Sequence, residues 1–403
     1  MSSNLWSELP VGVISNNNNK QANSTTTTFS RTQSNKNKMT KTRQTQKSIS
    51  NPLNAVNTTP MSRYPQNILD KMHPHELFYF NSQISFNLPL KNIEWIVGPH
   101  DFTILQFNGR NFFIFGEAHN LEEQMENLYN DERPLNKNIT VGFDGFVRSL
   151  INEYPTFNFE LYYEKTTGWI KREENNHINN KHIRTQFITS MLRVLDILFL
   201  NCSRFFDKSE CEYPNLRVHH ADARYYSFTR DVLVKIYYYD KLTPEQIEHW
   251  NKQLTNYVTN SKIFLKLIDK QSTGINESIK EQISTYFKAL FSKPSTTQKE
   301  LIDKFSLLLD YYTILRMLRN FDETKTTYGR TKHWEQKNII GYFGYKHSEN
   351  IVLLLKKLGA KIFYRDTEEQ YDYPTVKIDK TKKCIDIIDE LIQNGYAQSG
   401  VNL

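Results

Sequence analysis

Cysteine is scarce in this chain, with three among 403 residues. Cys202, Cys211 and Cys384 have the spacing of neither a disulfide framework nor a CxxC-type zinc site. Cys202 and Cys211 are near enough in sequence to pair across a short loop, but reduced thiols in an intracellular protein are the simpler interpretation. We therefore expect neither a cross-linked scaffold nor a cysteine-bound metal.

Long apolar runs are also lacking. No stretch of 18 apolar residues is present, which argues against a membrane-spanning helix and a membrane partner. The N-terminus does not show the charged segment and apolar segment of a secretory signal, so we expect an intracellular location. Abundant Asn, Lys and Ile are typical of an AT-rich genome such as that of a large DNA virus, and the location would then be the host cytoplasm or the virion.

The body of the chain lacks an excess of charge. The formal net charge is +7, but residues 1–60 hold seven basic residues and one acidic residue. The remaining 343 residues hold 44 basic and 43 acidic residues. A basic groove for nucleic acid is therefore not expected on the folded part.

Residues 1–65 are poor in apolar side chains and rich in Asn, Ser, Thr, Gln and Lys, with homopolymer runs at Asn16–Asn19 and Thr25–Thr28. Such sequence buries too little apolar surface to offset its ordering entropy, so we predict a disordered, basic tail. A solvated tail without activity is the favoured interpretation. A weak electrostatic tether to an anionic partner is the alternative, and a nucleic-acid arm is a poorer one because the cations are dispersed.

Residues 66–240 are predicted to form a first α/β half. The segment Asp101–Phe115 has two apolar runs joined by Asn108-Gly109, and Asn-Gly supplies the positive φ values of a type I′ hairpin. Phe157–Tyr163 and Leu216–His219 have the composition of further strands.

Residues 241–330 are predicted to form a helical insertion. Thr243-Pro244-Glu245-Gln246 combines an N-cap, a proline at the first helical position and a glutamine that closes a capping box. Apolar residues at helical spacing predict further helices over 279–291 and 299–321.

Residues 331–403 are predicted to form a second α/β half. They contain a strand at 338–343, a helix at 348–358 and a strand at 360–364, with a final helix at 383–393. The predicted fold class is α/β, with duplicated strand–helix halves that form a central mixed or parallel sheet and a helical insertion between them.

One five-residue phrase of the form F-G-x-x-H occurs twice, at Phe115–His119 and at Phe343–His347. Each copy ends an apolar, strand-like run and precedes helix-competent sequence. Ligand sites in open α/β sheets lie at the carboxyl ends of strands, where a glycine lets the backbone bend and approach a ligand. We therefore predict that His119 and His347 meet over one site.

This site suits a metal ion. Two histidines with carboxylates favour a first-row divalent metal such as Mn²⁺, Co²⁺ or Zn²⁺, with an open position for water. The residues predicted as metal ligands are His119, His347 and Glu117.

Polar side chains after other predicted strands extend the site. A metal would lower the pKa of bound water, a free carboxylate would act as general base, and an arginine would hold a developing oxyanion. The residues predicted as catalytic are Glu117, Glu164, Asp222 and Arg224.

Each of these residues also has an ordinary structural interpretation, which stays open here. A helix cap at His119, a helix-dipole partner at Glu117 and a salt bridge between Asp222 and Arg224 each explain one feature. In the adjacent pair His219-His220, only one ring can readily face a given site.

The order of these motifs resembles the TraB/TIKI superfamily, with its erythromycin-esterase-like and ChaN-like relatives. Gly116–His119 matches the family's GExH phrase, and Gly344–His347 matches the G-x-x-H phrase after a helical middle. Glu164 resembles the intermediate glutamate, and Arg316 or Arg319 the intermediate arginine. The resemblance covers roughly residues 100–365.

The resemblance implies a duplicated α/β domain with a pocket between its halves. TIKI members are described as divalent-metal-dependent proteases, erythromycin esterases open macrolactones, and ChaN-like proteins bind haem. The chain departs from the secreted and membrane-anchored branches, and Lys346 places a positive charge beside His347.

Three functions therefore compete. The first is a metal-assisted hydrolase that cleaves a peptide, ester or lactone bond in a peptide or small-molecule substrate. The second is a pocket that binds haem or a small molecule without turnover. The third is a virion-associated structural protein that keeps the scaffold without its chemistry.

Overall fold

The computed structural model of the chain describes residues 88–117, 138–164, 212–222, 241–321, 336–366, 375–377 and 384–397, with Leu192, Leu195, Leu198, Phe199, Cys202 and Ile236. All of them belong to one compact unit, and they form an α/β fold, as predicted. The predicted tail and two predicted site residues, His119 and Arg224, lie outside the described residues.

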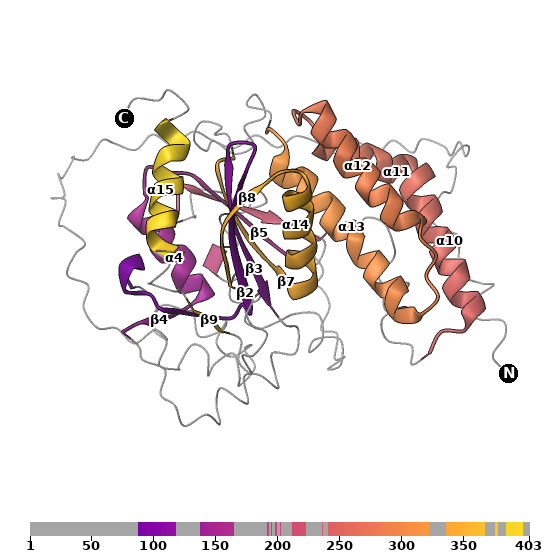
Figure 1. The fold of residues 1–403 in the computed structure, drawn as a ribbon, viewed down its shortest axis with the longest axis horizontal. Coiled ribbons are helices and arrows are strands. Elements are labelled where there is room, and N and C mark those ends of the chain that lie inside the picture. Colours follow the sequence, from indigo (N-terminus) through magenta and orange to yellow (C-terminus); the bar gives the residue numbers. More distant parts are fainter. Residues whose placement is uncertain are drawn as a thin grey trace, which may run out of the picture. The chain divides into compact units, whose positions relative to one another are not determined.

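The centre of the fold is a mixed sheet of six strands in the order β6-β5-β7-β3-β2-β8 (Figure 1). Strands β6, β5, β7 and β3 are parallel to one another, whereas β2 is antiparallel to both β3 and β8. The strands are β2 Asp101–Phe107, β3 Arg110–Glu117, β5 Phe159–Tyr163, β6 Leu216–His220, β7 Asn338–Gly344 and β8 Lys361–Asp366.

The hairpin between β2 and β3 has the predicted turn. Asn108 has a φ of 50° and Gly109 a φ of 69°, as a type I′ turn requires at its two central residues. Phe107 pairs with Arg110 directly across this turn, so the turn fixes the register of the whole hairpin.

A second, smaller sheet was not predicted. It consists of β4 (Thr140–Gly142), β1 (Trp95–Val97) and β9 (Thr375–Lys377), with the short 3₁₀ helix η3 (Leu90–Asn92) before β1. Each of these strands has three residues. A run that short is too brief to show the alternation that marks a strand in sequence.

One face of the six-stranded sheet, here called the core face, carries the main hydrophobic core. Side chains such as Phe113, Phe115 and Tyr342 point to it and pack with helices α4 (Phe143–Glu153) and α15 (Cys384–Ala397). Full burial of an aromatic side chain of this kind contributes about 1.5–3 kcal/mol, so this cluster contributes substantially to stability.

The opposite face, here called the helical face, is covered by α13 (Gln298–Leu318) and α14 (Tyr345–Lys357). Helices α10 (Pro244–Asn260), α11 (Lys262–Gln271) and α12 (Glu277–Ser292) pack on α13 and account for the predicted helical segment (Figure 1). Every residue of α13 from Leu308 to Leu318 is buried, because this helix has neighbours on all sides.

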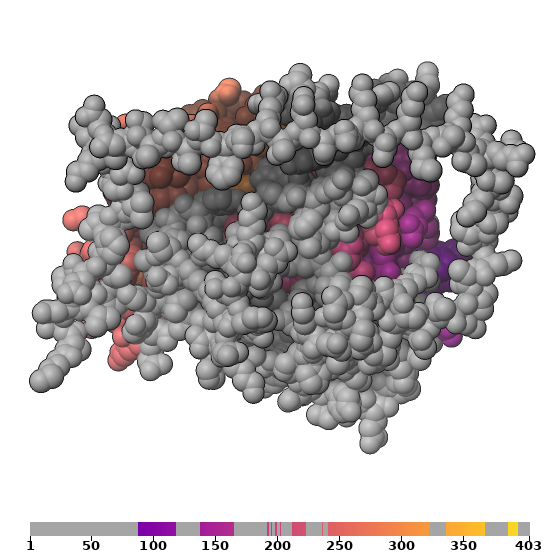
Figure 2. All heavy atoms as spheres, turned by 180° about the vertical axis from the view of Figure 1, so that it is seen from behind, coloured from indigo at the N-terminus to yellow at the C-terminus, as the bar shows by residue number. Residues whose placement is uncertain are grey.

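The start of α10 confirms the predicted capping box. The Thr243 hydroxyl accepts from the backbone N–H of Gln246, and the Gln246 side chain accepts from the backbone N–H of Thr243. The described residues of this helical segment are seen at one side of the space-filling view, and those of the first strands at the other (Figure 2).

Strand β7, helix α14 and strand β8 form the predicted strand–helix–strand unit. Gly359, with a φ of 97°, follows the last turn of α14, as predicted. Strands β7 and β8 run in the same direction but are not neighbours, because the β2–β3 hairpin lies between them in the sheet.

Cys202 corrects one expectation. It is disulfide-bonded, so the interpretation that the thiols are reduced is wrong at this position. Spacing in sequence does not show which cysteines come within bonding distance.

Across the described part of the chain, no helix combines the length and apolar character needed to cross a membrane.

Candidate functional site

The two copies of the repeated phrase end neighbouring parallel strands. Strand β3 pairs with β7 along its whole length, from Asn111 opposite Asn338 to Glu117 opposite Gly344. Their carboxyl ends therefore meet at one edge of the sheet, where ligand sites of α/β folds lie. Because His119 lies outside the described residues, the meeting of His119 with His347 stays a prediction.

The two copies are not in equivalent positions, because the register is offset by one residue. Gly116 pairs with Phe343 rather than with Gly344. Side chains alternate between the faces of a sheet, so an offset of one residue sends corresponding side chains to opposite faces. Phe115 accordingly lies on the core face and Phe343 on the helical face.

The sheet edge gathers the four predicted site residues that the structure describes. Glu117 ends β3, Glu164 directly follows β5, Asp222 is two residues beyond β6, and His347 is three residues beyond β7. All four are at the carboxyl edge of parallel strands, as the sequence predicts. The four differ in which face of the sheet they occupy.

His347 lies on the helical face and is held by α13. Its Nδ1 is 2.6 Å from Oδ1 of Asp310, and the ring is 4% exposed. The other carboxylate oxygen of Asp310 accepts a 2.8 Å hydrogen bond from Nδ2 of Asn350, one turn further along α14. These contacts fix both the imidazole and the carboxylate that orients it.

Glu164 approaches the other nitrogen of the same ring. Its Oε1 is 3.6 Å from Nε2 of His347, which is longer than a hydrogen bond. Its Oε2 accepts a 3.1 Å hydrogen bond from the backbone N–H of Gly344, the N-cap of α14, where a helix favours negative charge. The imidazole of His347 therefore lies between two carboxylates, one in tight contact and one in loose contact.

Glu117 lies on the other side of the sheet from His347. It is 1% exposed and accepts a hydrogen bond from the Tyr342 hydroxyl, within the aromatic surroundings of the core face. In the part of the chain that the structure describes, no three His, Cys, Asp or Glu side chains are arranged to hold a metal ion. Glu117 and His347 alone do not form a metal site, and binding through His119 stays a prediction.

Asp222 is buried and lies two residues beyond the end of β6. The residue before it, Ala221, donates its N–H to the Tyr163 carbonyl and accepts from the Thr313 hydroxyl of α13 at 3.3 Å. The backbone that carries Asp222 is thus fastened to both the sheet and α13.

The adjacent histidines of β6 face opposite ways, as expected. His220 lies on the core face, with Nε2 3.0 Å from the Tyr163 hydroxyl. His219 lies on the helical face, with Nε2 2.6 Å from Oε2 of Glu160 and Nδ1 3.1 Å from Nη2 of Arg316. Arg316 is one of the two arginines that resemble the family's intermediate position, and here it holds a histidine.

A group of polar residues lies around His219, all of them buried except the partly exposed Arg217, and we call it the Glu160 cluster. It comprises Glu160, Arg217, His219, Gln271 and Arg316. The His219 ring is also stacked between the rings of Tyr162 and Phe321. Burial lowers the pKa of His219 to about 3 and outweighs the raising effect of Glu160, so the ring is neutral.

Sequence reasoning missed Asp310, which is the closest partner of His347. The signal was present in α13, because Asp310 is an acid inside the continuous apolar run that ends this helix. Acidic side chains are rarely fully buried unless they have a partner, so its position indicated one.

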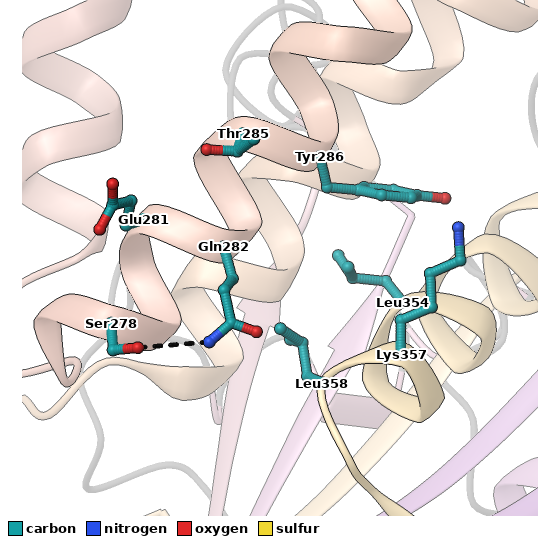
Figure 3. Close-up of a pocket in the computed structure, with 8 residues that line it drawn as sticks. All are labelled: Ser278, Glu281, Gln282, Thr285, Tyr286, Leu354, Lys357 and Leu358. Atoms are coloured by element: carbon teal, nitrogen blue, oxygen red, sulfur yellow. Dashed lines mark hydrogen bonds between the residues drawn. The ribbon is translucent and has the colours of Figure 1, made fainter.

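A shallow groove of about 440 Å³ lies elsewhere, between α12 and the second half of α14 (Figure 3). Figure 3 shows Tyr286 and Lys357 on facing helices, and the Lys357 ammonium lies 4.7 Å from the Tyr286 ring centre. None of the predicted site residues lines this groove. Its lining residues are Ser278, Glu281, Gln282, Thr285, Tyr286, Leu354, Lys357 and Leu358.

Comparisons of the chain with protein-family models, with curated proteins and with solved structures found no match in any of the three. The resemblance to the TraB/TIKI superfamily therefore rests on the motifs alone.

Proposed function

We propose that this chain is a hydrolase that cleaves a peptide, ester or lactone bond, with His347 as its proton-transferring group. The observation that carries this proposal is the position of the His347 imidazole between Asp310 and Glu164 at the carboxyl edge of the sheet. Histidine is the commonest general acid or base in enzymes, and a carboxylate on one nitrogen fixes the direction of the other.

The chemistry follows from the two unequal contacts. Asp310 accepts from Nδ1–H and leaves Nε2 directed toward Glu164. We propose that one water molecule binds to both Nε2 of His347 and Glu164, which lie 3.6 Å apart. His347 takes a proton from this water as its oxygen attacks the carbonyl carbon, and then gives the proton to the leaving oxygen or nitrogen as the bond to carbon breaks.

Asp310 and Glu164 make this exchange easier. The negative charge of Asp310 stabilises the imidazolium that forms when His347 accepts the proton. Positioned proton transfer of this kind contributes a factor of about 10²–10⁴ in rate. Arg224 is proposed to stabilise the oxyanion and Asp222 to add a carboxylate at this edge, whereas Glu117, on the other face of the sheet, takes no part in this step.

Metal assistance is a separate part of the proposal. A divalent metal such as Mn²⁺, Co²⁺ or Zn²⁺, bound through His119 and His347, would supply a water molecule of lowered pKa. Nδ1 of His347 contacts Asp310, so a metal would bind at Nε2, and Glu164 would then be the proton-accepting group in place of His347.

The test is hydrolysis of a panel of chromogenic esters, lactones and peptides by the wild type and three variants. We expect His347→Gln to lower kcat/KM by about 10² or more, and Asp310→Asn to lower it to a similar degree. His249→Gln, at an exposed histidine of α10, is the matched control and should match the wild type. Equal hydrolysis by wild type and His347→Gln would exclude the proposed role.

Metal assistance is tested by incubating the protein with Mn²⁺, Co²⁺ or Zn²⁺, removing free metal and measuring what is retained. We expect retention by the wild type and loss in the His119→Ala/His347→Ala double variant. Equal retention by both proteins would reject metal binding at these histidines and leave the histidine-based mechanism standing.

A further inference from the structure

Asp101 occupies an unusual position at the same edge of the sheet. It is the first residue of β2, it pairs with Gly116 of the first repeated phrase, and it is 1% exposed. Both of its carboxyl oxygens lie 3.2 Å from Oγ of Ser348, the residue directly after His347. One buried carboxylic acid residue therefore pairs with Gly116 of the first phrase and contacts Ser348, the residue after the second phrase.

We propose that Asp101 is a positioning residue, whose neutral carboxyl group joins the end of β3 to the first turn of α14 and so holds His347 in the candidate site. This inference names a residue that the sequence analysis did not consider. Its consequence for catalysis rests on the proposed function, whereas its structural claim does not.

The hydrogen-bond inventory around Ser348 supports a neutral carboxyl group. Besides the two oxygens of Asp101, the carbonyl oxygen of Tyr345 lies 2.8 Å from Oγ of Ser348. A hydroxyl has one proton, so it donates to only one of these three acceptors. When Asp101 is protonated, it donates to Ser348, Ser348 donates to Tyr345, and each group has a partner. When Asp101 is ionised, the Ser348 hydroxyl donates either to Asp101 or to Tyr345, and the carboxylate keeps the backbone N–H of Gly116 as a donor.

The surroundings of Asp101 favour the neutral carboxyl group below about pH 7. Burial raises the pKa of Asp101 to about 7, against the lowering effects of the Ser348 hydroxyl, Arg365 of β8 and the backbone of Gly116. Glu349 of α14 adds a raising effect. These are the groups that face Asp101 from β3, β8 and α14.

The space around Gly116 shows how closely the three segments meet. A Cβ atom on Gly116 would overlap both Oδ1 of Asp101 and Oγ of Ser348. The glycine of the first phrase is therefore required by the bridge between Asp101 and Ser348. The bridge explains why β3 and α14 approach so closely beside His347.

The test measures the ring nitrogens of His347 by NMR in protein labelled with ¹⁵N-histidine, at pH 6, below the pKa of Asp101, with the signal assigned by its loss in His347→Gln. Asp101→Asn carries an amide N–H that can replace the acid proton, and we expect it to keep the wild-type tautomer ratio of His347. Asp101→Ala and Ser348→Ala break the bridge, and we expect each to change that ratio by about fivefold or more.

Asp269→Asn, the same substitution at an exposed residue of α11, is the control and should leave the His347 signal unchanged. An unchanged His347 signal in folded Asp101→Ala and Ser348→Ala would overturn the proposal, even if their thermal stability fell. A change in Asp101→Asn as large as in Asp101→Ala would overturn the neutral carboxyl. If Asp101→Ala does not fold, Ser348→Ala, which loses a single hydroxyl, decides the question.

The NMR measurement needs no substrate, so it separates this inference from the proposed function. A tautomer change together with no hydrolysis by the wild type would reject the hydrolase and keep the positioning role. Hydrolysis that depends on His347, together with an unchanged ring signal in the alanine variants, would keep the hydrolase and reject the positioning role of Asp101.

Discussion

Two buried histidines on the helical face of the sheet differ in how their rings are held. His219 has tight contacts at both nitrogens, with Glu160 at 2.6 Å and Arg316 at 3.1 Å, and lies between two aromatic rings. His347 has one tight contact, with Asp310 at 2.6 Å, and one loose contact, with Glu164 at 3.6 Å.

This difference distinguishes a histidine with a structural role from one that is proposed to transfer protons. His219 has a cation on one side and no free nitrogen, so it has little capacity to take up a proton. His347 has a carboxylate on each side, and its contact with Glu164, at 3.6 Å, is longer than a hydrogen bond. Burial alone therefore does not indicate function, whereas the charge and distance of the ring's partners do.

The largest effect is expected from removing the charge of Glu160. The carboxylate is fully buried and pairs with Arg217 and His219, so Glu160→Gln removes a buried charge from both contacts. We expect a loss of about 3–5 kcal/mol in the free energy of unfolding, measured by urea denaturation. Glu277→Gln, at an exposed residue of α12, is the control. A loss below about 1 kcal/mol would mean that the Glu160 cluster is not structural.

Acid should destabilise the protein through His219. Its pKa falls from 6.5 to about 3 on folding, so the unfolded chain binds the proton first and stability is lost as pH falls through this range. The expected loss is about 3 kcal/mol between pH 6.5 and about pH 4. Unfolding curves of wild type and His219→Gln at several pH values test this, because the variant should lose less. Parallel losses in both proteins would refute the assignment.

The smallest effect on stability is expected at the other histidine. Asp310→Asn keeps an oxygen that accepts from Nδ1 of His347 and leaves no arginine among its described partners unpaired. We expect a loss of about 1 kcal/mol in the free energy of unfolding, measured as for Glu160→Gln. A loss of about 3 kcal/mol or more would place His347 in the same structural class as His219.

Local signals in the sequence predicted much of the fold. The Asn108-Gly109 turn, the capping box at Thr243 and the stop at Gly359 each depend on a few adjacent residues, and the structure confirms all three. The apolar runs predicted the strands of the large sheet, since burial on both faces requires continuous apolar sequence. The three-residue strands carried too little pattern to be found.

The candidate site was predicted less completely. The rule that parallel strands share a carboxyl edge placed Glu117, Glu164, Asp222 and His347 at that edge correctly. It did not show which face of the sheet each side chain occupies, because that depends on register. Asp310 was missed because it comes from a helix, and the pairing of α13 with α14 is a tertiary contact that no local pattern specifies.

The offset between β3 and β7 has a consequence for anyone who looks for internal symmetry in this chain. Aligning the two halves by their shared sequence motif places Gly116 on Gly344. Aligning them by the backbone pairing of β3 with β7 places Gly116 on Phe343. The two alignments disagree by one position at every residue. An engineered exchange of the two segments, aligned by their shared motif, would move the core-face residues of each strand to the helical face and the helical-face residues to the core face.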